Sequence, residues 1–216
     1  MAGVTVTTVY SSTVDGHINS SNVVYLTARA GSGLVTNTAG VTFTTGQTLP
    51  AGISNCFEGF VSFDTSPIPD AEPITAATLS LWATTKVVAS SDFTLEARSS
   101  NWGASLDTGD WVAGASLSAL TLLASIATTA VTTGQYNDLT ENGTNLRTAI
   151  DVTGTTWILL DSDRHVAGNV PTGGEQVTCS SADEAGTTQD PKLVVTSTSS
   201  FNDSGMTSMA LVGVGH

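Results

Sequence analysis

Residues 59–81 read GFVSFDTSPIPDAEPITAATLSL, and this stretch decides the fold. Its first part carries the aromatic and β-branched residues that are typical of a strand. Pro67 and Pro69 then turn the chain, because proline fixes its own φ and restricts the residue before it. From residue 74 onward the chain alternates with a period of two, which predicts a second strand. One face of that strand carries Ala77, Leu79 and Leu81.

The rest of the chain repeats this pattern of short strands and turns. Further strands are expected over residues 4–10, 41–45, 53–63, 74–86, 93–98, 117–126, 131–136, 157–160, 175–181 and 193–196. Residues 11–22 read as a polar loop, and Leu146 and Ile150 indicate one short helix over residues 142–150. Many short strands separated by turns predict an all-β fold, an antiparallel β-sandwich of the jelly-roll type.

Composition agrees with a β protein that forms one domain. The chain has 216 residues, a length that suits a single core. Only 12% of them are charged, against about 25% in an average globular protein. We expect residues 1–197 to form the domain and residues 198–216 to form a tail. That tail is either a frayed terminus or an arm that docks on a neighbouring subunit as an added strand.

The charge balance excludes several classes of partner. Asp and Glu number 19 against 6 Lys and Arg, which gives a formal net charge of −13. Few basic residues are available to neutralise phosphates, so we expect neither nucleic-acid binding nor attraction to anionic membranes. The first residues lack the basic and apolar regions of a signal peptide, and no run approaches the roughly 20 apolar residues of a membrane span.

Three places in the sequence carry a family resemblance. The first strand ends in Phe63-Asp64, an Ile68-Pro69 corner follows, and the next strand places Ile74, Ala77, Leu79 and Leu81 in the order Ile-x-x-Ala-x-Leu-x-Leu. The segments over residues 154–160 (GTTWILL) and 191–195 (PKLVV) match a penultimate and a closing strand. Together they resemble the DNRLRE-type domain, a β-sandwich related to carbohydrate-binding modules. The match spans roughly residues 5 to 197.

The resemblance implies a folded interaction module with no particular ligand. Such domains occur in secreted, cell-surface and bacteriophage virion proteins. Sandwiches of the carbohydrate-module type often hold a structural calcium ion with loop carboxylates and carbonyls. On that analogy alone, the candidate calcium ligands here are Asp15, Asp161 and Asp190.

One histidine lies close to acidic residues in the sequence. Asp161, Asp163 and His165 alternate directly after an expected strand. Alternation places all three on one side, so they are candidates for a metal site. The alternative is a solvated loop in which one of the aspartates pairs with Arg164.

The two cysteines also allow two interpretations. Cys56 and Cys179 lie far apart in the sequence, outside any CxxC or zinc-ligand pattern. They are either two small buried thiols in the core or the ends of one disulfide that joins an early strand to a late one.

Two tryptophans in an expected loop are the candidate ligand-binding residues. Exposed tryptophans stack on sugar faces in carbohydrate-binding modules, because the indole offers broad apolar contact with an N–H at its edge. Trp102 and Trp111 are candidates for that role. The alternative is that both cap one end of the core.

No catalytic pattern stands out, so we do not expect an enzyme. A Gly-x-Ser-x-Gly elbow is missing, as are GxGxxG and Walker patterns. The carboxylate pairs Asp107/Asp110 and Asp183/Glu184 lie in polar loops, where glycosidase chemistry would need a defined gap across a cleft.

These observations predict a structural virion protein of a tailed phage or related virus. It would be a capsid decoration or tail accessory protein, located in the virion, that stabilises or ornaments the particle by contact rather than by chemistry. Its expected partners are other capsid or tail subunits and further copies of itself, with a trimer the favoured oligomer. The alternative function is a carbohydrate-binding or adhesion module that recognises surface glycans. No cofactor is expected beyond the structural calcium.

Overall fold

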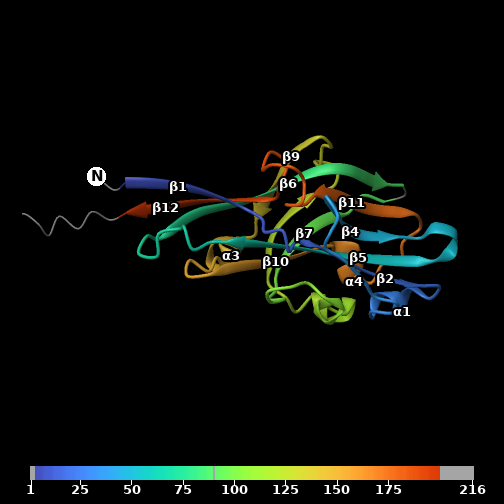
Figure 1. Cartoon of the computed structure of the whole chain (residues 1–216). Helices are drawn as coiled ribbons and strands as arrows, with labels where there is room; N and C mark the ends of the chain where they lie inside the picture. Colours follow the sequence, from blue (N-terminus) through green and yellow to red (C-terminus); the bar gives the residue numbers. More distant parts are fainter. Residues whose placement is uncertain (1–2, 90, 200–216) are drawn as a thin grey trace, which may run out of the picture.

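A computed structural model describes residues 3–89 and 91–199, which form twelve strands and four short α-helices (Figure 1). The strands are β1 (Gly3–Tyr10), β2 (Gly16–Asn22), β3 (Val35–Asn37), β4 (Thr42–Thr48), β5 (Ser54–Asp64), β6 (Ile74–Val88), β7 (Thr94–Ser99), β8 (Leu122–Ala127), β9 (Gln135–Glu141), β10 (Thr155–Ser162), β11 (Gly174–Ser180) and β12 (Lys192–Ser199). The helices are α1 (Tyr25–Arg29), α2 (Gly114–Leu117), α3 (Asn145–Ala149) and α4 (Asp163–Ala167).

The strands form one continuous antiparallel sheet that closes on itself. Its order includes β6-β11-β4-β5-β10-β7-β8-β9, and β9 pairs again with β6. The predicted all-β, antiparallel fold is confirmed. The predicted sandwich is not what the pairing shows, because eight strands join into a closed barrel instead of two separate sheets.

Two long strands explain this closure. The 15-residue β6 pairs with β12 through its first half, with β11 through its second half, and with β9 around Leu81. The 11-residue β5 pairs with β4 at one end and with β10 at the other. At the junction, Gly46 has a φ of 113°, and a Cβ there would lie 2.3 Å from the carbonyl oxygen of Glu175. Glycine therefore allows β4 to lie against both β5 and β11.

Four strands lie outside the closed ring. β12 pairs with β6 and carries β1 on its other edge, and the two reach beyond the barrel at one end of the elongated molecule (Figure 1). β2 pairs with β5, and β3 pairs with β2. β1 and β3 are therefore edge strands among the described residues.

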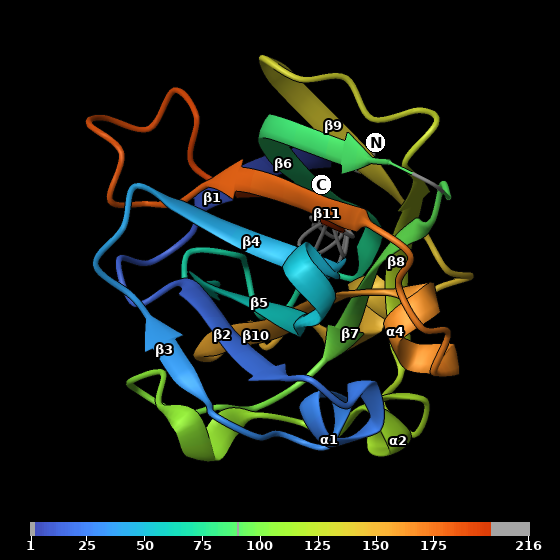
Figure 2. The ribbon, with the colours of Figure 1, turned by 90° about the vertical axis from the view of Figure 1, so that its right-hand side faces the viewer.

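The apolar interior falls into two main parts. The larger fills the barrel and includes Phe43, Phe63, Leu79, Leu81 and Leu160. A smaller one lies on the opposite face of β5 and β10, under the loop that precedes α2 (Figure 2). It contains Ile18, Phe60, Trp102, Leu106, Leu117 and Leu159. β5 and β10 are thus buried on both faces, which explains why they read as nearly continuous apolar runs.

Several predicted elements differ from the observed ones. The predicted polar loop over residues 11–22 contains β2, which buries Ile18 and Ser20. The strand predicted over residues 117–126 begins only at Leu122, since residue 117 ends α2 and a turn follows it. The predicted helix over residues 142–150 is confirmed as α3, but three further short helices were not expected.

Two other expectations concern the ends of the chain and the membrane. β12 continues to Ser199, beyond the predicted domain boundary at residue 197, and the rest of the predicted arm over residues 198–216 lies outside the described residues. Among the described helices, none has the length and apolar character needed to cross a bilayer.

Candidate functional site

The candidate site begins where β5 and β10 part. The last pair in their register is Gly59 with Leu160, so the next positions along the two strands are Glu58 and Asp161. Side chains two residues apart in a strand share a face, which places Glu58 on the side of Phe60. That face is buried, and both acids are therefore held inside the protein.

Helix α4 adds the third side chain of the site. The hydroxyl of Ser162 caps the helix by accepting a hydrogen bond from the backbone N–H of His165 at 3.0 Å. Gly168 ends it in a left-handed conformation with a φ of 76°. The single turn between them brings the imidazole back over the end of β10.

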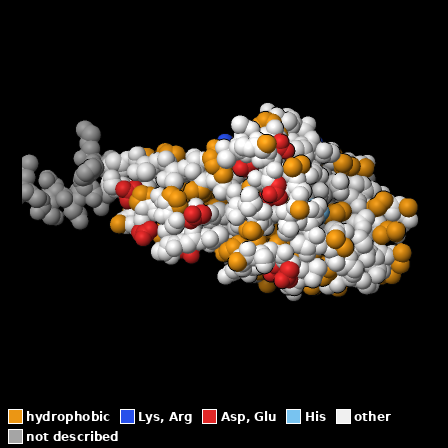
Figure 3. All heavy atoms as spheres, in the orientation of Figure 1, with side chains coloured by type: hydrophobic (Ala, Val, Ile, Leu, Met, Phe, Trp, Pro, Cys, Tyr) orange, Lys and Arg blue, Asp and Glu red, His pale blue; other side chains and the backbone are white. Residues whose placement is uncertain are grey.

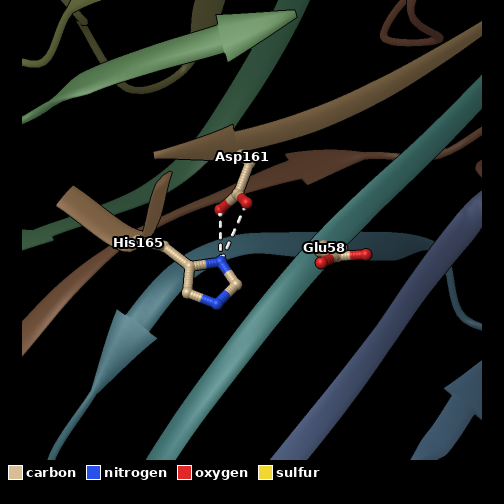
Figure 4. A group of neighbouring side chains, drawn as sticks. All are labelled: Glu58, Asp161 and His165. Carbon is tan, nitrogen blue, oxygen red and sulfur yellow. Dashed lines mark hydrogen bonds and ion pairs between the residues drawn. The ribbon is translucent and has the colours of Figure 1, made fainter. Parts of the chain in front are cut away.

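The three side chains form a compact buried cluster (Figure 4). Glu58, Asp161 and His165 are each 0% exposed, and one potential ligand atom from each lies within 4.8 Å of the other two. The Nδ1 atom of His165 lies 2.8 and 3.0 Å from the two carboxylate oxygens of Asp161. Asp161 also accepts the backbone N–H of Ser162 at 2.7 Å.

The Glu58 side chain makes the fewest hydrogen bonds of the three. Its Oε2 accepts the backbone N–H of Val112 at 3.0 Å, and its Oε1 has no hydrogen-bond partner among the described residues. Burial raises the pKa of Glu58 well above its ordinary value, and the nearby Asp161 carboxylate raises it further. Without a cation, this carboxyl group is expected to be neutral.

A second polar network lies beside the cluster. Glu175, fully buried on β11, accepts hydrogen bonds from Arg164 Nε at 2.7 Å and from Gln47 Nε2 at 2.8 Å. The Tyr25 hydroxyl donates to Gln47 Oε1 at 2.9 Å. Arg29, at the end of α1, donates to the carbonyl oxygens of His165 and Val166 in α4 and of Gly114 in α2, which links the three helices.

The sequence predicted part of this cluster. Asp161 and His165 do come together, but Asp163 does not join them, because its carboxylate accepts the backbone N–H of Thr94 at 2.9 Å. Asp163 therefore lies outside the cluster, in which Glu58 lies beside Asp161 and His165. The signal for Glu58 was a lone acid at a position that strand alternation makes buried, between Cys56 and Phe60.

The three predicted calcium ligands do not share one site. Asp161 belongs to the cluster with His165, whereas Asp15 and Asp190 lie near each other elsewhere. Asp15 is buried and accepts hydrogen bonds from Ser11 Oγ at 2.9 Å and from the backbone N–H of Ala182 at 3.0 Å. Burial raises the pKa of Asp15 to about 7, and the charges of Asp183 and Asp190 add to the rise.

The tryptophans occupy core positions rather than an open platform. Trp102 is only 5% exposed and packs edge-to-face against Phe60 and Trp157. Trp111 is half-buried, and its ring lies 5.9 Å from that of His165. Stacking on a sugar face needs an exposed ring. Trp102 is therefore not available for the glycan-binding role expected of it, and only a small part of the Trp111 ring is accessible.

The cysteines are two separate buried thiols. Cys56 packs with Tyr25 and Ala28, Cys179 lies in the barrel core, and both are free. Burial raises the pKa of Cys179 to about 12 and that of Cys56 further still. The interpretation as buried thiols is confirmed over that as a disulfide.

We expect neither thiol to react in the native protein, because reaction needs an accessible thiolate. A thiol-specific chromogenic reagent should report no reactive group in native protein and both groups after unfolding in denaturant without a reductant. A native reaction at either cysteine, or none after unfolding, would contradict this arrangement.

Comparisons with known proteins found no relative: no protein-family model matches the chain, and no curated protein matches its sequence. The resemblance to the DNRLRE-type domain therefore stays a prediction that rests on the residues quoted above.

Proposed function

We propose that this protein is a structural component that assembles with further copies of itself through β1, in the manner of a decoration or accessory protein on a virus particle. The observation that carries the proposal is the free edge of β1. Among the described residues, β1 pairs along its length with β12 alone. Within residues 3–89 and 91–199, its other edge therefore presents backbone N–H and C=O groups that no strand pairs, a ready template for another strand.

The side chains of β1 favour such docking. Val4 and Val6 are 67% and 62% exposed, and Tyr10 on the same face is also exposed. β-branched residues with no charge are the opposite of the lysines and prolines that usually protect an edge strand. An exposed, uncharged edge of this kind is expected to pair with another chain.

The outer surface next to β1 is equally poor in charge. The register places Thr196, Val194 and Lys192 opposite Val6, Thr8 and Tyr10. Lys192 is half-buried, and its Nζ lies 3.9 Å from the centre of the Tyr136 ring. Acidic side chains are scattered over the face of the molecule seen in Figure 3, where basic ones are rare. A surface poor in charge is where two copies of so acidic a protein can meet with least repulsion.

The occupant that fits best is a second β1. Two antiparallel β1 strands related by a twofold axis would satisfy each other's backbone groups and bring the valines of both copies together. The sheet would then continue from one molecule into the next.

The location of the protein and its relation to the jelly-roll fold are also part of the proposal. The resemblance to the DNRLRE-type domain supports a phage virion as the location and capsid or tail subunits as further partners. It also supports an interpretation of the barrel as a closed form of the jelly-roll sandwich. Burial of the Glu58 cluster supports a role that works by contact, since a dissolved substrate does not reach side chains that are 0% exposed. No observation favours the glycan-binding alternative.

Oligomeric state tests the proposal directly. Light scattering during size-exclusion chromatography of the full chain should show a dimer, the oligomer that a twofold contact between two β1 strands closes. The double variant Val4→Lys/Val6→Lys should be a folded monomer at the same concentration, because lysine on an edge strand opposes pairing. Both valines are exposed, so the change leaves the core intact.

The matched control places the same substitution elsewhere. Val170 is 55% exposed and lies outside every strand, so Val170→Lys should keep the oligomer of the unsubstituted chain. A monomeric unsubstituted protein, or an oligomer that survives the two lysines on β1, would refute docking through this edge.

A further inference from the structure

We propose that Glu58, Asp161 and His165 bind one divalent transition-metal ion of the zinc class, which ties β5, β10 and α4 together. This inference does not depend on the proposed assembly function. It starts from the cluster of Figure 4, in which two carboxylates and one imidazole from three different elements converge inside the protein.

The separations suit a small divalent ion. Zinc lies about 2.0 to 2.2 Å from imidazole nitrogen and carboxylate oxygen, so two of its ligand atoms are at most about 4.4 Å apart. The three candidate ligand atoms already lie within 4.8 Å of one another without any ion between them. A contraction of a few tenths of an ångström brings them into range.

Unpartnered atoms in the cluster supply the second observation. Glu58 Oε1 and His165 Nε2 are buried and have no hydrogen-bond partner among the described residues. A buried polar atom without a partner costs roughly 1 to 3 kcal/mol, and such atoms are rare in native proteins. Of the two, Glu58 Oε1 is the atom that a metal ion held with Asp161 would satisfy, because the His165 nitrogen beside Asp161 is Nδ1.

The nearby cations do not supply the missing charge. Arg164 is paired with Glu175, and Arg29 donates to three backbone carbonyls. Glu58 therefore has no basic partner of its own among the described residues. A divalent ion would balance both carboxylates of the cluster at once, with the imidazole as a neutral ligand.

The donor set selects the class of metal. Calcium and magnesium prefer oxygen ligands and take more of them than this cluster offers. One imidazole nitrogen with two carboxylate oxygens suits zinc, cobalt or manganese. Because the site is enclosed, the ion would enter as the chain folds, and its binding energy would add to the stability of the fold.

Metal content of the purified full chain tests the inference. Protein produced in medium with added zinc and freed of loosely held ions should retain about one equivalent of zinc, by elemental analysis. Protein produced with cobalt(II) instead should show the visible absorption of an enclosed, low-coordinate cobalt site. The same preparation with calcium or magnesium should retain neither ion.

Two substitutions distinguish this site from surface binding. Glu58→Gln keeps an oxygen to accept the Val112 N–H and removes one charged ligand, so retained zinc should fall at least about tenfold while the fold persists. Asp163→Asn is the control, because Asp163 bonds to Thr94 outside the cluster, and its zinc content should be unchanged. If Glu58→Gln retains as much zinc as the unsubstituted chain, or if neither retains any, the cluster is a metal-free carboxyl–imidazole network and the inference is wrong.

Discussion

Arg164→Met is expected to destabilise the protein by about 3 to 5 kcal/mol, because it leaves a buried carboxylate without its cation. Glu175 is fully buried, and Arg164 Nε lies 2.7 Å from its Oε2. Once the arginine is gone, the hydrogen bond from Gln47 is the only one that remains to that carboxylate among the described residues. Methionine preserves most of the apolar stem of arginine, so the loss reports the charge rather than the packing.

The free energy of unfolding in urea measures this effect, and a second substitution tests its cause. Adding Glu175→Gln to Arg164→Met removes the unpaired charge, so the double variant should regain most of the lost stability. Arg147→Met is the matched control: it breaks the more exposed ion pair with Glu141, and its cost should be clearly smaller. Equal losses for the two arginine variants would show that burial of Glu175 is not the cause.

The strands followed from the sequence because their signals are local. The apolar run before Asp64 and the alternation after Pro73 correctly predicted β5 and β6 as two strands joined by a corner, although the two strands do not pair with each other. β2 was missed because its polar sequence, GHINSSN, hides the fact that Ser20 is buried and bonded to the carbonyl oxygens of Ala28 and Ser32. Burial of a hydroxyl depends on partners elsewhere in the chain, which no local pattern reveals.

Closure of the barrel and completion of the site both depend on contacts between distant segments. The alternation of residues 161, 163 and 165 brought Asp161 and His165 together for a different reason from the one the structure shows, which is the single helical turn of α4. Glu58 joins them only through the register of β5 with β10, which is set by side chains on both strands. The same applies to the pairing of β9 with β6, on which the difference between a barrel and two separate sheets depends.

Asp15→Asn is expected to make the protein more stable at neutral pH, by an amount that depends on pH. Burial raises the pKa of Asp15 to about 7 in the folded protein, whereas its ordinary value in an unfolded chain is about 3.9. The folded state therefore holds a proton that the unfolded state has already released between these two values. The free energy of unfolding falls as pH rises from about 4 to about 7, by on the order of 4 kcal/mol from this group alone.

The neighbours of Asp15 explain why asparagine suits this position. The carboxylates of Asp183 and Asp190 lie close enough to oppose its charge, and each of the three has one buried oxygen without a hydrogen-bond partner among the described residues. An asparagine oxygen would still accept from Ser11 and from the Ala182 N–H, and its NH₂ group could donate toward the other two carboxylates. The substitution removes repulsion and keeps the existing hydrogen bonds.

Denaturation of both proteins at a series of pH values from 4 to 8 isolates the effect of Asp15 and its two acidic neighbours, because titrating groups remote from them contribute equally to the two curves. The difference in stability should be small near pH 4, grow in favour of Asp15→Asn up to about pH 7, and then level off. Asp138→Asn is the control, since that carboxylate accepts from Ser80 at 2.6 Å on the outer face, and it should show no comparable gain toward neutral pH. A difference between Asp15→Asn and the unsubstituted chain that does not change with pH would mean that Asp15 is already ionised in the fold, so that its burial is offset by a positive charge held beside it.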